Sequence, residues 1–189
     1  MTVIIILVIV ALLVGWGVSV QRKLVSAEEL CKNSLSQIGV QQNSRWDAIT
    51  ALVDLIKSYN EHEYKTLRDV IAQRKEITGN SSVADANAQE DAIGKVFSQI
   101  KLVAEQYPEL KANEQYIKAM DSVNTYENQV RLSRMTYNDT VTKFNQLVRM
   151  FPDSLIAGLL HFGAKDYLKE PAGKTEMPNI NIPPSGSAS

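Results

Sequence analysis

The sequence predicts an all-α protein, in which an N-terminal transmembrane helix continues into a long antiparallel four-helix bundle. Three observations lead to this prediction. The first twenty residues, Met1 to Val20, carry no charged side chain. From Trp46 onward, apolar residues recur at steps of three and four, which is the period of an amphipathic helix. All six prolines lie beyond Tyr107 and aromatic residues are only 7% of the chain, which favours helices over a β-rich fold.

The apolar segment 1–20 is long enough to cross a bilayer. A helix of this length spans about 30 Å, the thickness of the hydrocarbon core. No basic side chain precedes the segment and its end lacks an A-x-A type site, so we predict a permanent single-pass anchor rather than a signal peptide. Trp16 suits the membrane interface. Arg22 and Lys23 follow at once, and the positive-inside rule then places the domain on the cytoplasmic side of the inner membrane.

Composition limits the partners that the chain could have. Its 20 basic and 21 acidic residues give a net charge of −1, which is no electrostatic footprint for nucleic acid. With Cys31 as its one cysteine, the chain forms no intrachain disulfide. We divide the chain into a transmembrane anchor (1–20), one helical-bundle domain (21–168) and a disordered tail (169–189) rich in Pro, Gly and Ser.

Two predicted helices occupy the first half of the domain. Residues 22–42 continue the membrane helix and place Leu24, Ala27, Cys31, Leu35 and Ile38 on one face. A second helix begins with Ser44 as its N-cap, Asn43 being the alternative, and runs from Trp46 to about Thr78. The sequence Gly79-Asn80-Ser81-Ser82 ends that helix. A pattern of this length is typical of a coiled coil or a long bundle helix.

Two more helices and a short apolar turn complete the predicted bundle. The third helix covers about 93–107 and ends at Tyr107-Pro108, because proline disfavours helical geometry in the residue before it. The fourth covers about 116–151 and ends at Phe151-Pro152. We expect the apolar turn at 154–160 to fold back over the open end of the bundle. Modest loops predict that neighbouring helices run antiparallel.

We term each series of residues at alternating steps of three and four a ladder. Most ladder positions are apolar, but charged residues occupy some of them: Glu63 and Arg74 in one helix, and Glu127 and Arg134 in another. One interpretation is that each ladder drifts, so that these side chains reach water. A second is a buried layer of Glu and Arg that sets the register of the helices. In this second case we expect Arg134 to pair with a carboxylate of another helix, with Glu63 as a candidate. A third is a functional role in a groove.

The sequence predicts no catalytic, cofactor-binding or metal-ligating residue, and no cofactor. His62-Glu63 begins a zinc motif, but position 66 is Thr66 where H-E-x-x-H requires histidine. Cys31 has no base beside it, which favours a buried structural thiol. Nucleotide-binding glycine motifs and the G-x-S-x-G motif do not occur.

Several short motifs resemble the LemA family. They are Ser36-Gln37-Ile38-Gly39-Val40-Gln41, Leu52-Val53, Tyr59-x-x-His62-Glu63, Arg74, Tyr107-Pro108-Glu109-Leu110-Lys111-Ala112-Asn113, Glu127-Asn128, Arg134, Tyr137-Asn138, Phe144-Asn145 and Phe151-Pro152-x-x-Leu155-Ile156-Ala157-Gly158. The resemblance implies a bacterial protein with one N-terminal membrane helix, a long antiparallel helical bundle and no known catalytic residue. Gly39 stands where the family usually has Asp, and the proline that the family places near Thr50 is absent. Because glycine weakens a helix interior by about 1 kcal/mol relative to alanine, we expect the break between the first two helices near Gly39.

The sequence leaves three functional hypotheses. The first is a non-enzymatic bundle that binds an unidentified protein or scaffolds an assembly at the inner membrane, with the bilayer contacted through Met1 to Val20. The second is a lipid-interacting module, in which the apolar turn from Leu155 to Leu160 also touches the bilayer. The third is an enzyme subunit that uses Glu63 and Glu127. Homo-oligomerisation stays open.

Overall fold

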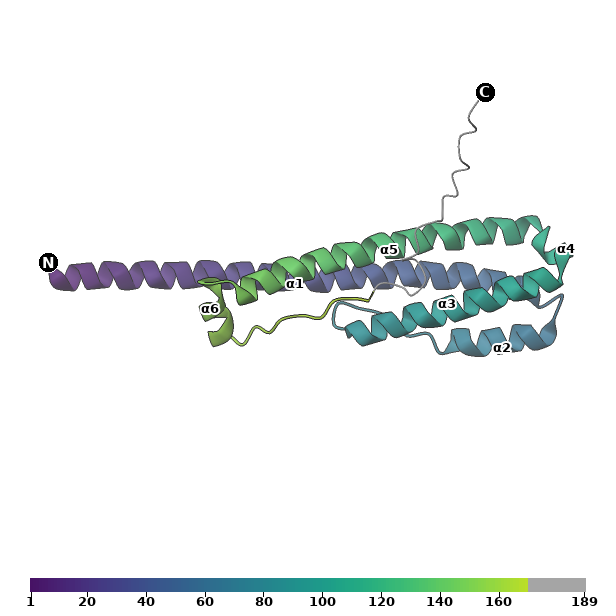
Figure 1. The fold of residues 1–189 in the computed structure, drawn as a ribbon, viewed down its shortest axis with the longest axis horizontal. Helices are drawn as coiled ribbons and strands as arrows, with labels where there is room; N and C mark the ends of the chain where they lie inside the picture. The colour runs from purple at the N-terminus through teal and green to yellow at the C-terminus, as the bar shows by residue number, and fades with distance from the viewer. Residues whose placement is uncertain (170–189) are drawn as a thin grey trace, which may run out of the picture.

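The computed structural model describes residues 1–169, and these contain helices but no β-strand. Six helices follow one another along the chain: α1 (Thr2–Ile56), α2 (Glu61–Ala72), α3 (Val83–Gln106), α4 (Pro108–Lys111), α5 (Glu114–Arg149) and α6 (Asp153–Leu159). The predicted all-α fold is therefore confirmed for these residues. Figure 1 shows an elongated molecule in which the N-terminal part of α1 projects beyond the other helices.

Helix α1 is a single helix of 55 residues, so it extends for about 80 Å. Its first part is long and apolar enough to cross a membrane, and those side chains pack against almost nothing in the protein. The prediction that this segment continues directly into the domain is confirmed. The expected break near Gly39 is wrong, and so is the Ser44 cap: both residues lie inside α1, where the Ser44 hydroxyl donates to Val40 O.

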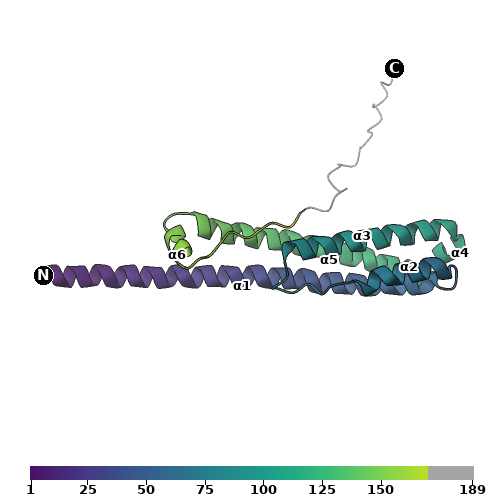
Figure 2. The same cartoon turned by 90° about the horizontal axis from the view of Figure 1, so that it is seen from below.

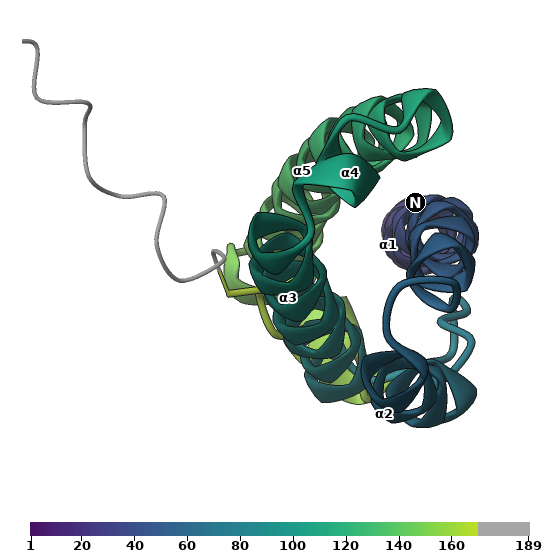
Figure 3. The ribbon, with the colours of Figure 1, turned by 90° about the vertical axis from the view of Figure 1, so that its right-hand side faces the viewer.

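The helices pair around α1, whose most extensive partner is the antiparallel α5. Figures 1 and 2 show these two helices side by side over most of the length of α5. Helices α2 and α3 lie only against the half of α1 that is remote from the N-terminus, as Figures 1 and 2 show. The end-on view of Figure 3 shows how α1, α2, α3 and α5 are grouped around the long axis. The structure therefore differs in detail from the predicted four-helix bundle, since the described residues form six helices, of which α2 has 12 residues and α5 has 36.

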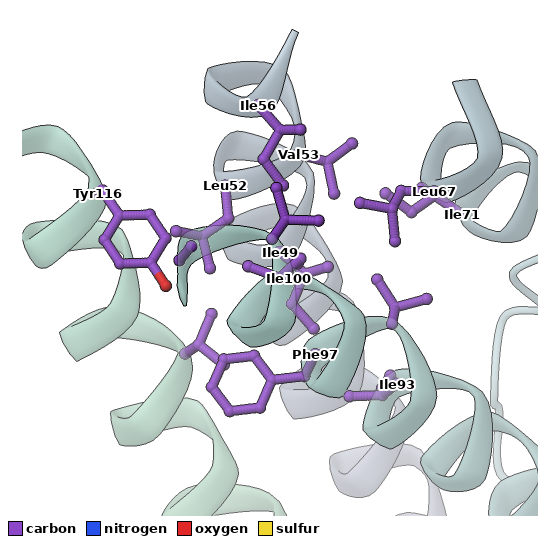
Figure 4. Close-up of a cluster of buried hydrophobic side chains, with 14 of the residues drawn as sticks. Ile49, Leu52, Val53, Ile56, Leu67, Ile71, Ile93, Phe97, Ile100 and Tyr116 are labelled. Atoms are coloured by element: carbon purple, nitrogen blue, oxygen red, sulfur yellow. The ribbon is translucent and has the colours of Figure 1, made fainter. Parts of the chain in front are cut away.

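The largest hydrophobic core lies in this distal half and draws on α1, α2, α3, α4 and α5 (Figure 4). Most of its fully buried members come from the apolar ladders that the spacing predicted: Trp46, Ile49, Leu52, Val53, Ile56, Leu67, Ile93, Val96, Ile100 and Val123. Leu110 of α4 is also fully buried there, although the spacing did not predict it. Tyr116 and Phe97 close the core between α3 and α5 (Figure 4). The hydrophobic effect over these side chains holds the distal half together.

The predicted second helix, from Trp46 to about Thr78, is wrong as one element. Its first part is the end of α1, which stops at Ile56, and the chain then reverses through residues 57–60 into α2. The Asn60 side chain caps α2, because its Oδ1 accepts from Glu63 N at 3.1 Å. Residues 73–82 are not helical and lie against α1. At Gly39 an added Cβ would stand 1.8 Å from Ile77 O, so only glycine permits this approach.

The second half of the chain follows the sequence prediction more closely. Helix α3 ends at Gln106 before Tyr107-Pro108, and α5 ends at Arg149 before Phe151-Pro152. The short apolar turn is helix α6, which packs on α1 near Val20 and Leu24 rather than over the distal core. Residues 160–169, here termed the strap, then run along α5. Apart from Lys169, the predicted disordered tail (169–189) lies outside the described residues.

Candidate functional site

A buried arginine joins three helices at the centre of the distal half. Arg45, on α1, is 3% exposed. Its Nη1 lies 2.7 Å from Glu90 Oε1 on α3, and its Nη2 lies 3.2 Å from Glu127 Oε2 on α5. We term Arg45, Glu90, Glu127 and Gln42 the Arg45 cluster. One guanidinium placed between two carboxylates satisfies charge that would otherwise be costly to bury.

Neighbouring polar side chains extend the Arg45 cluster along α1. Gln42 Nε2 donates to Ala86 O and to Glu90 Oε2, each at 3.3 Å. One turn further, Trp46 Nε1 donates to Gln89 Oε1 at 3.2 Å. Two buried atoms, Gln42 Oε1 and Arg45 Nε, have no hydrogen-bond partner in the structure. The cluster therefore fixes the register of α3 and α5 on α1, as a buried polar layer does in helical bundles.

One side of the Arg45 cluster borders an open groove of about 870 Å³, lined by all three charged members together with α3 residues. The carboxylates of Glu90 and Glu127 both turn to the guanidinium. Each carboxylate is therefore held in a fixed orientation by its contact with Arg45.

The four charged residues that interrupt the ladders have different surroundings. Glu127 belongs to the Arg45 cluster, as the buried-layer interpretation predicted. Arg74 is exposed and lies 3.1 Å from Asp47, which agrees with the drift interpretation. Glu63 is half-buried on α2, a helix that packs on α1 and α3. The structure does not bring Glu63 and Glu127 together.

The predicted pair of Arg134 with Glu63 is wrong. Arg134 is buried on α5, where its Nη2 donates to Asn87 Oδ1 at 2.8 Å and to the carbonyl of Lys169. Burial lowers the pKa of Arg134, while the charges of Glu90 and Asp91 act in the opposite direction. The physical reason for the difference is the end of α1 at Ile56, which turns Glu63 toward the distal tip and away from the middle of α5.

Two asparagines of α5 hold the strap by its main chain. Asn145 accepts from Lys165 N at 2.8 Å and donates to Lys165 O at 2.9 Å. Asn138 makes the same pair of bonds with Leu168, at 2.9 and 3.1 Å. We term these two side chains the amide clamp. Their spacing of seven residues puts both on one face of α5, two turns apart.

Further contacts close the strap over the middle of the molecule. Tyr137 OH donates to Asp166 O at 3.3 Å, and Lys165 Nζ lies 3.0 Å from Glu28 Oε1 on α1. Leu168 enters a second hydrophobic cluster that includes Cys31 and Phe144. Sequence reasoning missed the clamp, although Tyr137-Asn138 and Phe144-Asn145 carry its signal: an asparagine after an inward aromatic residue, repeated at an interval of seven.

The titratable groups in this second cluster are structural. Cys31 is buried, and burial raises the pKa of its thiol, although the Thr140 hydroxyl opposes that shift. A thiol with a raised pKa is a weak nucleophile. Burial also raises the pKa of Tyr137 to about 12. Both side chains are therefore neutral at physiological pH and serve packing.

The histidines lie apart in the structure. His62 is exposed on α2, and His161 is exposed at the start of the strap with a φ of 59°. Within residues 1–169, no group of three or more His, Cys, Asp or Glu side chains could hold a metal ion. His62-Glu63 therefore has no further ligand near it in that part of the chain.

These observations define a class of protein: an elongated all-α domain, organised by buried polar contacts, on a helix long and apolar enough to span a membrane. Family comparison matches residues 34–182 to the LemA family, and the chain belongs to that family. The chain is also similar to Protein LemA of Metamycoplasma hominis, with 23% identity over 130 residues. That match covers 67% of this chain but 58% of the relative, so the chain spans less than two thirds of the relative's length.

Proposed function

We propose that this protein is a membrane-anchored, non-enzymatic scaffold that binds a protein partner through the distal end of its helical domain. The anchor is the apolar part of α1, and the domain lies on the cytoplasmic side of the inner membrane. Because α1 is unbroken from Thr2 to Ile56, the distal end stands roughly 55 Å beyond Val20. A rigid support of this length suits a protein that presents a surface at a fixed distance from the bilayer.

The observation that carries the proposal is a groove at the distal end, between α3, α4 and α5. Its volume is about 380 Å³, and Ala104, Tyr116, Ile117 and Met120 form its apolar part. Charged side chains of both signs surround them: Lys101, Glu105, Lys111 and Asp121. An apolar centre with aromatic and methionine side chains inside a charged rim is the usual composition of a protein interface. We term this surface the distal groove.

The alternatives differ in their support. An enzyme subunit that uses Glu63 and Glu127 would need these carboxylates in one pocket, whereas Glu127 holds Arg45 and Glu63 lies on α2. A lipid-interacting role depends on α6, which packs on α1 beside the end of the apolar segment. Lipid contact at α6 would add to a protein-binding role at the other end of the molecule and would not replace it.

Site-specific photo-crosslinking of the full-length protein in native membranes tests the proposal. A photoreactive residue replaces Ile117, which is 48% exposed in the distal groove, or Leu132, which is 56% exposed on α5 outside it. We expect one discrete protein adduct at position 117, its loss when Lys101→Glu and Lys111→Glu reverse the rim charge, and none at position 132. Equal labelling at positions 117 and 132 would refute binding at this groove. An adduct at position 117 that persists after Lys101→Glu and Lys111→Glu would refute it as well.

A further inference from the structure

The depth of α6 is fixed by its packing against α1. Ala157 is buried together with Val20 and Leu24, and an added Cβ at Gly17 would lie 3.7 Å from Ile156 Cδ1. The apolar segment of α1 ends at these same residues, with Arg22 and Lys23 directly after it. If α1 crosses a bilayer, α6 therefore lies at the level of the lipid headgroups and the first part of the acyl chains.

The exposed side chains of α6 and of the residues on either side of it suit that depth. Phe151 is 79% exposed, Leu155 60% and Leu159 72%, and Met150 and Leu160 are exposed beside them. Five exposed large apolar residues in a stretch of eleven are unfavourable in water, where each loses the free energy of burial. Contact with lipid at the interface removes this cost, and the bilayer is already present at this level of α1.

A groove at the level of α1 where α6 packs combines an apolar floor with positive charge. It has a volume of about 780 Å³ and lies between α1 and the end of α5. Gly15, Val18, Leu30 and Leu147 contribute apolar surface, while Arg22, Lys23 and Lys143 contribute three cations and no carboxylate lines it. None of the three cations belongs to an ion pair of residues 1–169. We term this surface the juxtamembrane groove.

We propose that the juxtamembrane groove binds an anionic phospholipid from the membrane that α1 crosses. The phosphate lies among Arg22, Lys23 and Lys143, and an acyl chain descends along Gly15 and Val18 into the bilayer. An added Cβ at Gly15 would meet nothing within 4 Å, so the space there is free for a chain. This inference rests on the membrane placement within the proposed function, but not on the distal groove.

The two tryptophans give the protein a built-in probe. Trp16 follows Gly15 of the groove in the sequence and packs against the cluster of Val20, Leu24 and Ala157, whereas Trp46 is buried in the distal core. Thirty residues of α1 separate them, about 45 Å, so lipid-borne quenchers reach only Trp16. The experiment reconstitutes the full-length protein in vesicles of phosphatidylglycerol and phosphatidylcholine, with bromine on the chains of one lipid or the other.

We define selectivity as the quenching of Trp16 by brominated phosphatidylglycerol divided by the quenching expected from the fraction of that lipid in the vesicle. We expect this selectivity to exceed one. Removal of one cation in Lys143→Gln lowers this selectivity about fivefold, and Arg22→Gln with Lys23→Gln lowers it further. The matched control is Arg131→Gln, which removes one exposed cation from a part of α5 outside the groove and leaves the selectivity unchanged. Wild-type selectivity near unity, or selectivity that survives the loss of all three cations, would overturn the proposal.

Two further measurements distinguish a lipid bound in the groove from non-specific electrostatic attraction of anionic lipids to the basic side chains. Gly15→Leu fills the apolar floor and keeps every charge, so it lowers the selectivity only if a lipid occupies the groove; an unchanged value would refute the site. Inorganic phosphate at matching concentration does not compete, whereas effective competition would mean that a free anion is bound instead. Adducts at position 117 persist in Lys143→Gln, so failure at one end of the molecule is distinguishable from failure at the other.

Discussion

Arg45 shows how much depends on one residue in this fold. Its guanidinium is the cation between two carboxylates whose side chains are only 14% and 24% exposed. Such an arrangement contributes little net stability compared with an apolar core of the same shape, because desolvation offsets the Coulombic attraction. Loss of the cation alone is a different matter, because both carboxylates then lose the guanidinium they share and reach water only on the side of the groove.

Arg45→Met therefore tests the cluster at the scale of one residue. Methionine retains most of the volume, so we expect a loss of about 3 kcal/mol in the free energy of unfolding, because both carboxylates lose their contact with the guanidinium. Chemical denaturation of the detergent-solubilised protein measures this loss. Arg74→Met is the matched control, because Arg74 pairs with Asp47 in an exposed position and should cost at most about 1 kcal/mol. Equal effects of the two variants would contradict the buried cluster.

At the scale of elements, the approach of segment 73–82 to α1 depends on glycine. A Cβ at Gly39 would meet Ile77 O at 1.8 Å, and one at Gly79 would meet Lys32 O at 2.8 Å. The neighbours are main-chain atoms, which cannot turn away as a side chain does. The glycine that suggested a helix break is instead the place where a second segment crosses an unbroken helix.

Gly39→Ala sets helix propensity against this contact. Alanine gains about 1 kcal/mol in a helix interior, whereas forced overpacking costs about 1–3 kcal/mol, so we expect net destabilisation and a lower Tm. Gly94→Ala on α3 is the matched control, since an added Cβ there meets nothing within 4 Å. That variant should raise the free energy of unfolding by up to about 1 kcal/mol. A stabilising Gly39→Ala would mean that segment 73–82 does not lie against α1.

The amide clamp makes the strap an element in its own right. Asn145→Ala removes both bonds to Lys165, and each lost partner of a buried group costs about 1–3 kcal/mol. We expect the Lys165 and Leu168 amides to exchange with solvent at least about tenfold faster, while amides of the distal core keep their protection. Hydrogen exchange read by mass spectrometry measures this, with exposed Asn128→Ala as control. Uniform loss of protection would mean that the strap and core unfold together.

The sequence predicts which face of each helix is buried better than it predicts where the chain reverses. Proline marks the ends of α3 and α5, and both ends are as expected. No proline or glycine marks the end of α1 at Ile56. The apolar residues of α2 happen to continue the three- and four-residue spacing of α1, so the sequence pattern does not show where one helix stops and the next begins. Its one local signal is Asn60 with Glu63 three residues later, a capping pattern.

Arg45 was missed for a related reason. Placing a helix start at Ser44 put Arg45 before the ladder, although Ile38, Gln42, Arg45, Ile49, Leu52 and Ile56 follow one sequence of four and three steps. The partners of Arg134 are long-range and partly main-chain atoms, which spacing within one helix does not specify. Local patterns thus predict which face is inside, whereas pairing across helices depends on where the chain reverses.

At the scale of the whole molecule, the proposed membrane placement makes α1 the link to both proposed binding surfaces. The orientation of α1 then decides which compartment they face. Arg22 and Lys23 directly follow the apolar segment. The positive-inside rule therefore predicts a cytoplasmic domain. An alkaline phosphatase fused after Ser189 should be inactive in a bacterial host, because the enzyme folds only outside the inner membrane, whereas a fluorescent protein fused there should be bright.

Variants that change the charge after the apolar segment provide the control for the phosphatase experiment. Arg22→Glu with Lys23→Glu removes the basic pair and should allow part of the population to insert with the opposite orientation, which gives measurable phosphatase activity. Arg131→Glu changes charge far along the domain and should leave the fusion inactive. Strong phosphatase activity in the unmodified chain would place both grooves outside. Lipid binding at the juxtamembrane groove would then involve the outer leaflet, and a partner of the distal groove would have to be sought outside the cytoplasm.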